Sequence, residues 1–106
     1  MATLTVVAVV KARAGKEAAL EAALRAVIPP THAEAGCRTY ALHHSAEDPA
    51  TFVFVEKWDS KEALDAHLGS AHIQDLFRKV PDLLAEPARI LTLNPLPAGQ
   101  VAKGLL

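Results

Sequence analysis

Four consecutive apolar residues, Phe52-Val53-Phe54-Val55, break the usual alternation of a β-strand. Successive side chains of a strand point to opposite faces of the sheet, so a strand with one solvated face alternates apolar and polar residues. This segment is apolar on both faces, and both faces of its sheet therefore need cover. A chain of 106 residues supplies helices for one face at most. We expect the other face to pack against a second copy of the chain, in a homodimer.

The rest of the pattern predicts the order β-α-β-β-α-β. Segments rich in β-branched and aromatic residues are expected to form strands, and apolar stripes with helical spacing predict the helices. The predicted strands span 3–12, 37–46, 50–58 and 88–93, and the first helix spans 16–28. With right-handed crossovers this order gives an α+β, ferredoxin-like fold, in which helices cover one face of an antiparallel sheet. The domain should span 1–94, followed by an irregular C-terminal tail over 95–106.

Proline, glycine and serine mark the expected helix ends. Pro29-Pro30 should end or kink the first helix, because proline lacks the amide donor and restricts the residue before it. Asp59 or Ser60 should cap a second helical region, and Gly69-Ser70 should divide that region into two pieces. These signals place the two histidines of the region, His67 and His72, on either side of a helix break.

The hairpin between the second and third strands sorts its side chains by face. A two-residue turn at Glu47-Asp48 would pair His43 with Phe52 and Thr39 with Glu56. One face then carries Thr39, His43, Phe52, Phe54, Glu56 and Trp58, and the other carries Tyr40, Leu42, Val53 and Val55. A loop of odd length would change the pairings. Aromatic walls with a few polar groups are typical of a small-molecule pocket. The alternative is that Glu56 and His43 lie at a solvated margin of the sheet.

Three histidines are candidates for a proton acceptor near such a pocket. His67 shares a helix face with Leu64 and Leu68 and should point inward, and His72 lies at the edge of the next apolar face. His43 shares the predicted face of the aromatic rings. Neutral imidazole is the usual base near pH 7, whereas a single inward histidine is more often a hydrogen-bonded core residue. Both interpretations stay open at this point.

Composition and motifs argue against several other classes. A formal net charge of −1 offers no basic field for nucleic acid. The apolar stretch 4–10 is too short to cross a membrane or to form a signal sequence, so we expect a cytoplasmic protein. His67 and His72 are separated by a helix break and lack the spacing of a helical zinc pair. The chain carries no metal or nucleotide motif. We therefore expect no metal site and no cofactor.

Two segments resemble the antibiotic biosynthesis monooxygenase (ABM) family: FVFVEKWDSKEALDAHLGSAH at 52–72 and AGCRTYAL at 35–42. The combination of Glu56, Trp58 and two following histidines is similar to the signature of the family, and the likeness extends from the first strand to about Leu93. The resemblance implies a dimeric α+β barrel, in which two ferredoxin-like sheets pack face to face.

The resemblance also implies a chemistry without flavin or metal. A phenol, hydroquinone or polycyclic aromatic substrate loses a proton, its anion reduces O₂, and recombination gives a quinone and water. Trp58, Phe52 and Phe54 would form the walls of the pocket, with Glu56 and Thr39 as its polar groups. His67, His72 or His43 would take the proton.

Two other activities occur on the same fold. A haem-degrading branch of the family typically has an asparagine in its first strand and a Trp–His pair in the second helical region. Here the first strand has no asparagine, and positions 67 and 77 hold His67 and Phe77, so haem degradation is disfavoured. A non-catalytic or isomerising protein that binds a small molecule in the same pocket is the alternative to an oxygenase.

Overall fold

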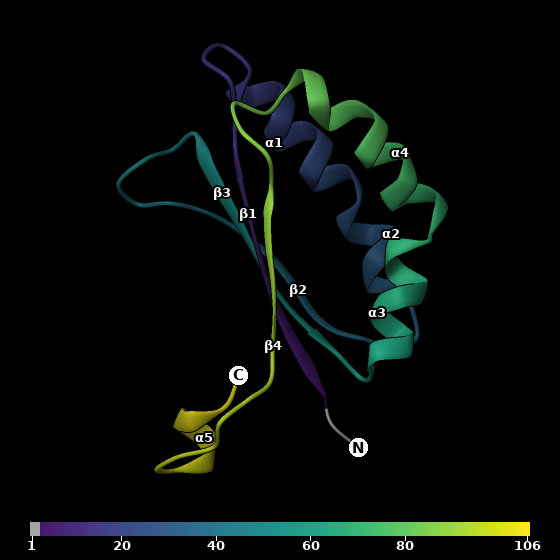
Figure 1. Ribbon diagram of the computed structural model, residues 1–106, viewed down its shortest axis with the longest axis vertical. Helices are drawn as coiled ribbons and strands as arrows, with labels where there is room; N and C mark the ends of the chain where they lie inside the picture. Colours follow the sequence, from purple (N-terminus) through teal and green to yellow (C-terminus); the bar gives the residue numbers. More distant parts are fainter. Residues whose placement is uncertain (1–2) are drawn as a thin grey trace.

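The computed structural model describes residues 3–106 and contains a four-stranded antiparallel sheet with strand order β2-β3-β1-β4. The strands are β1 (Leu4–Lys11), β2 (Cys37–His44), β3 (Thr51–Trp58) and β4 (Arg89–Leu93). All the longer helices lie on one face of this sheet (Figure 1). The element order and the strand order together are those of the ferredoxin-like fold, so the predicted fold class is confirmed.

The helical layer forms in two parts, as the sequence signals predict. The helices are α1 (Glu17–Ala26), α2 (Ile28–His32), α3 (Lys61–Leu68) and α4 (Ala71–Lys79), followed by the 3₁₀ turn η1 (Val80–Asp82). Pro29-Pro30 lies in the first turn of α2, where the missing N–H groups remove no helical hydrogen bond. Ser60 caps α3, because its Oγ accepts a hydrogen bond from the backbone N–H of Ala63 at 3.1 Å. Gly69-Ser70 separates α3 from α4.

The register of the β2–β3 hairpin differs from the predicted one. Tyr40 pairs with Glu56, Leu42 with Phe54 and His44 with Phe52. The loop between the paired His44 and Phe52 has an odd number of residues, and it is held by Asp48, whose carboxylate accepts from Ala50 N and Thr51 Oγ1. A one-residue shift of register exchanges the two faces of a strand. A bulge between Cys37 and Thr39 shifts the register again, so that Cys37 pairs with Trp58 at the far end.

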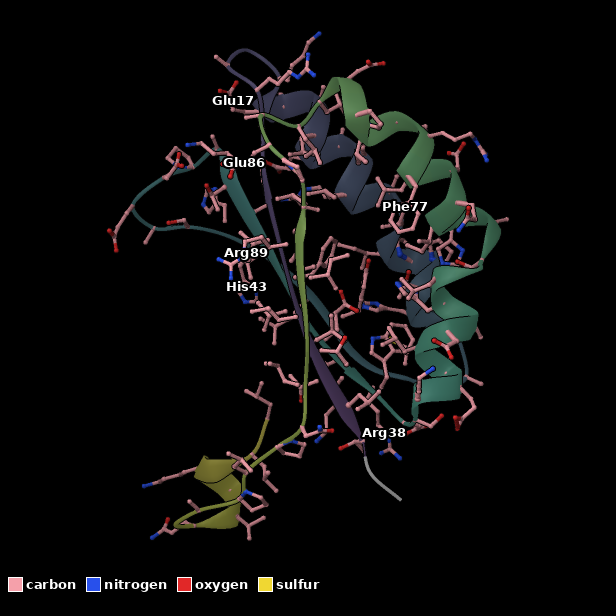
Figure 2. All side chains as sticks on the ribbon, in the orientation of Figure 1. Glu17, Arg38, His43, Phe77, Glu86 and Arg89 are labelled. Atoms are coloured by element: carbon pink, nitrogen blue, oxygen red, sulfur yellow. The ribbon has the colours of Figure 1, made fainter. Side chains whose placement is uncertain are left out.

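This shift corrects four of the predicted positions. Tyr40 and Leu42 were expected on the face of Val53 and Val55 but share the helix-covered face with Phe54 and Glu56. Thr39 and His43 were expected beside the aromatic rings but lie on the opposite face, and both are exposed. In Figure 2, His43 and Arg89 lie on the side of the sheet away from the helices. The predicted face with Phe52, Phe54, Glu56 and Trp58 is otherwise correct, because alternation within β3 does not depend on the register.

The core lies between the sheet and the helices. Its most completely buried large side chains are Val6, Leu20, Trp58 and Ile73. The opposite face of the sheet is also apolar, and among residues 3–106 none of the helices α1 to α4 lies over it. By register this face carries Val7, Val9, Val53, Val55, Leu91 and Leu93. Among residues 3–106, no helix is long and apolar enough to span a bilayer.

The segment after β4 departs from the predicted irregular tail by one short helix, α5 (Val101–Gly104). This helix lies away from the other helices, beyond the end of β4 (Figure 1). Leu96 and Val101 are largely exposed, and Lys57 Nζ donates a hydrogen bond to the backbone oxygen of Leu106. The tail therefore contributes little to the core of the chain.

Candidate active site

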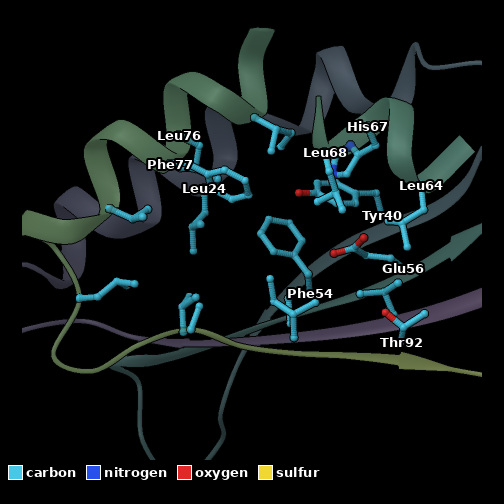
Figure 3. Close-up of a pocket in the computed structure, with 18 residues that line it drawn as sticks. Leu24, Tyr40, Phe54, Glu56, Leu64, His67, Leu68, Leu76, Phe77 and Thr92 are labelled. Carbon is cyan, nitrogen blue, oxygen red and sulfur yellow. The ribbon is translucent and has the colours of Figure 1, made fainter. Parts of the chain in front are cut away.

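A cavity of about 170 Å³ lies between the helix-covered face of the sheet and helices α1, α3 and α4. Most of its lining is aliphatic or aromatic, with Leu24, Phe54, Leu76 and Phe77 among the walls. Its polar side chains are Tyr40, Glu56, His67 and Thr92. Figure 3 shows these four at one end of the cavity, with Leu24, Leu76 and Phe77 at the other. An apolar cavity with a few convergent polar groups is the usual form of a small-molecule site.

Strand pairing and helix periodicity bring the polar groups together. Phe54 and Glu56 are two residues apart on β3 and therefore point to the same face. Tyr40 faces the cavity because it is the cross-strand partner of Glu56. His67 lies three residues after Leu64 on α3, so both point down onto the sheet. The phenol ring of Tyr40 stacks on Phe54 with ring centroids 4.4 Å apart and meets His67 edge-on at 5.2 Å.

Trp58 packs behind the polar side chains at one end of the cavity. It is fully buried and does not line the cavity, in contrast to its predicted place in the wall. Its indole lies 4.4 Å from the His67 ring between centroids, and its Nε1–H donates a hydrogen bond of 2.9 Å to Glu56 Oε1. Trp58 therefore orients Glu56 and packs against His67.

Burial alters the acid–base properties of Glu56 and Tyr40. Loss of hydration raises the pKa of Glu56 from an ordinary 4.5 to about 7, although the hydrogen bond from Trp58 lowers it; the charge of Glu34 raises it further. Burial raises the pKa of Tyr40 well above its usual value, with smaller contributions from Glu56 and Glu34. Tyr40 therefore stays a hydrogen-bond donor at any physiological pH, whereas Glu56 can gain or lose a proton near neutrality.

Glu34 joins the two histidines of the second helical region. Its Oε2 lies 3.0 Å from His67 Nδ1 and 2.8 Å from His72 Nε2. An ionised carboxylate only accepts hydrogen bonds, so the neutral His67 ring carries its proton on Nδ1 and leaves Nε2 as an acceptor. Burial lowers the pKa of His67, while the hydrogen bond to Glu34 opposes this effect. His67 is therefore held as a neutral, oriented imidazole at the wall of the cavity.

The structure brings together only part of the predicted site. His67, Phe54 and Glu56 line the cavity; Trp58 and His72 lie directly behind His67. Phe52 is buried in the same face but outside the cavity lining.

Sequence reasoning missed Tyr40 and Glu34. An odd-length hairpin loop would have placed Tyr40 in the pocket, and that alternative was visible in the sequence. Glu34 lies in the loop before β2, where no periodic pattern indicates the direction of a side chain.

Comparison with known proteins agrees with this architecture. The model of the ABM family, "Antibiotic biosynthesis monooxygenase", matches residues 3–79. The chain belongs to the antibiotic biosynthesis monooxygenase family. It is similar to "Putative monooxygenase Rv0793" of Mycobacterium tuberculosis, with 43% identity over 84 residues that cover 79% of this chain and 82% of that protein.

Two solved ABM-like structures extend the likeness to three dimensions. The structure of Rv0793 superposes with a TM-score of 0.86 at 38% identity, covering 92% of this chain and 99% of that one. The structure of PA3566 from Pseudomonas aeruginosa also gives a TM-score of 0.86, at 35% identity over 91% of this chain and 96% of that one. The ABM resemblance inferred from 35–42 and 52–72 is therefore confirmed at the level of the family and the fold.

Proposed function

We propose that this ABM protein is a monooxygenase that oxidises a small phenol or hydroquinone with O₂ and needs no cofactor. The observation that carries the proposal is the grouping of Tyr40, Glu56 and His67 at one end of an otherwise apolar cavity. Such a cavity would bind an aromatic ring and meet its hydroxyl group with both a hydrogen-bond donor and proton acceptors. The family and the name of its relative, "Putative monooxygenase Rv0793", support a monooxygenase.

The proposed reaction draws its electrons from the substrate. The phenolic O–H gives its proton to the protein, and the resulting anion transfers an electron to O₂. The aryloxyl radical and superoxide then combine at a ring carbon, and the peroxide loses water. One oxygen atom of O₂ ends in the quinone and the other in water, while the ring loses two hydrogen atoms, so the four electrons that O₂ requires all come from the substrate.

Two side chains of the cavity can take the proton. His67 offers Nε2, because Glu34 engages Nδ1, and Glu56 offers the oxygen that Trp58 does not bind. Tyr40 keeps its proton and would donate a hydrogen bond to the substrate anion. His43 lies on the other face of the sheet and has no place in this mechanism.

The volume of the cavity favours a substrate with one ring. An apolar protein cavity of about 150 Å³ accommodates benzene, and the cavity here measures about 170 Å³. We therefore favour a monocyclic phenol or hydroquinone over a polycyclic one.

We further propose that the protein works as a homodimer. The uncovered face of the sheet carries a continuous apolar surface that includes Val7, Val53, Val55 and Leu91, and a second sheet would remove it from water. The cytoplasmic location stays a prediction from the sequence.

Oxygen consumption with a panel of phenols and hydroquinones tests the enzymatic proposal. We expect uptake of one O₂ per substrate, and ¹⁸O₂ should label the quinone with one atom. Activity should persist after dialysis against a chelator. Tight binding of the same compounds without oxygen consumption would instead support the non-catalytic alternative, and loss of activity on chelation, restored by one metal, would refute a cofactor-independent reaction.

A further inference from the structure

Glu34, His67 and His72 form a cluster on the side of His67 that faces away from the cavity. Glu34 comes from the loop between α2 and β2, His67 from the last turn of α3, and His72 from the first turn of α4. One potential ligand atom from each residue lies within 4.8 Å of the other two. We propose that these three side chains bind one divalent transition-metal ion of the class of Zn²⁺, Ni²⁺ or Cu²⁺.

In the sequence, the helix break between His67 and His72 argued against a metal site. In the structure, the same break brings these two residues together. The break at Gly69-Ser70 ends α3 and starts α4, and Ser70 Oγ fixes it by donating a hydrogen bond of 2.6 Å to the backbone oxygen of His67. His72 thereby turns back towards His67, and their ring centroids are 6.2 Å apart. A carboxylate from a distant segment then completes the set, so helical i, i+4 spacing is not required.

The ligand chemistry fits this class of ion. Two imidazole nitrogens with one carboxylate oxygen form a borderline donor set, and metal–ligand bonds of about 2.0–2.2 Å place neighbouring ligand atoms about 3 Å apart. The two N···O separations at Glu34 Oε2 are 3.0 and 2.8 Å. On binding, each imidazole would carry its N–H proton on the ring nitrogen away from the ion, so that His67 Nδ1 and His72 Nε2 offer it their lone pairs. Ser70 Oγ, 3.3 Å from His72 Nε2, lies beside the open side of the site, where water would complete the coordination.

Access and charge also favour an ion here. The side chains of Glu34 and His72 keep 19% and 23% of their surface exposed, whereas His67 keeps 4%, so an ion can enter from the Glu34–His72 side without crossing the cavity. An ionised Glu34 carboxylate would give the site a negatively charged ligand beside two imidazole ligands. The site is therefore a cation site in contact with solvent on one side and with the buried Trp58 on the other.

Trp58 provides a specific reporter of occupancy. It is the only tryptophan of the chain, and its indole lies 4.4 Å from the His67 ring between centroids. A paramagnetic ion such as Cu²⁺ bound to His67 would quench its fluorescence. An ion bound at the exposed His44, at the C-terminal end of β2, would lie far from this indole along the strand.

The test uses the full chain without an affinity tag, freed of metal by dialysis against a chelator. Titration with Cu²⁺, followed by Trp58 fluorescence, and with Zn²⁺, followed by calorimetry, should show one ion per chain with a micromolar or lower dissociation constant. Zn²⁺ should also raise the melting temperature, because it binds the folded state. His72→Ala and Glu34→Gln should each weaken binding by more than about 100-fold, since loss of an outer-shell partner alone costs 10–100-fold.

Matched controls keep the result interpretable. His32→Ala and His44→Ala remove exposed imidazoles outside the cluster and should leave both titrations unchanged. His72 is partly exposed in the first turn of α4, where alanine is a good helix former, so the folded state should survive its removal. Binding weaker than micromolar, binding that survives His72→Ala, or binding that disappears with His44→Ala would overturn the proposal. No aromatic substrate enters these measurements, so they are independent of the proposed oxidation.

Discussion

The two faces of β3 differ in how far the rest of the chain covers them. Phe52, Phe54, Glu56 and Trp58 point under the helices and retain 0–5% of their exposure. Thr51, Val53, Val55 and Lys57 alternate with them and stay only partly covered. One face is thus completed within the chain and holds the cavity, whereas the other is apolar and only partly covered by the described residues. The difference separates the face that the chain covers by itself from the face that we propose a second copy covers.

A charged side chain introduced on the uncovered face should have the largest effect on this difference between the faces. Val53→Asp should dissociate or unfold the protein, because a dimer interface would bury an unpaired carboxylate at a cost of several kcal/mol. Sedimentation and thermal melts measure this effect. Ala66→Asp, which adds the same charge at an exposed position of α3, is the control and should change little. A wild-type protein that is a stable monomer at micromolar concentration would show that this face needs no partner.

On the covered face, His67→Ala separates a catalytic from a structural role. If His67 takes the proton, turnover should fall roughly 10²–10⁴-fold while the fold survives. If it is a satisfied core residue, the melting temperature should fall and turnover per folded molecule should stay nearly intact. Both quantities are measured on the same variant, with His44→Ala as the control, since His44 does not line the cavity.

Glu56, on the covered face, should make the free energy of unfolding depend on pH. Its pKa is raised to about 7 in the folded state, above an unfolded value of about 4.3. Its contribution to stability is therefore fully present below about pH 4.3 and declines as pH rises through 7, where the buried carboxyl must ionise. Glu56→Gln, which stays neutral, should be more stable than the wild type by up to about 3 kcal/mol above pH 7 and should show no such gain at pH 4.

Denaturant unfolding at several pH values measures this gain. Glu62→Gln, which changes an exposed carboxylate at the start of α3, is the matched control and should not make the protein more stable than the wild type above pH 7. A gain for Glu56→Gln that is equal at pH 4 and pH 8 would contradict a raised pKa.

Trp58→Phe should give the smallest effect. The change keeps an aromatic ring but removes the N–H that binds Glu56 Oε1. Because this hydrogen bond favours the ionised carboxylate, its loss should raise the pKa of Glu56 further, by an amount equivalent to about 1 kcal/mol. The midpoint of the pH–stability curve, or of the Glu56 signal in an NMR titration, should move upwards. An unchanged midpoint would mean that this hydrogen bond does not affect the pKa of Glu56.

Much of the fold could be read from local patterns. The element order, the cap at Ser60, the helix boundary at Pro29-Pro30 and the break at Gly69-Ser70 all follow from interactions between residues close in sequence. The inward direction of His67 followed from helical periodicity, and the shared face of Phe54 and Glu56 followed from strand alternation. In each case the geometry that decides the outcome spans only a few residues.

The composition of the site depended on the tertiary structure. Alternation determines which residues of one strand share a face, but the conformation of the loop 45–51 determines which residues of β2 face them. It placed Tyr40 rather than Thr39 and His43 beside Glu56. The meeting of Glu34 with His67 and His72 joins segments more than 30 residues apart. The sequence by itself determined the elements and which residues of one element share a face, because these depend on local periodicity. The tertiary structure decided the register and the side-chain cluster, because both depend on how distant segments pack.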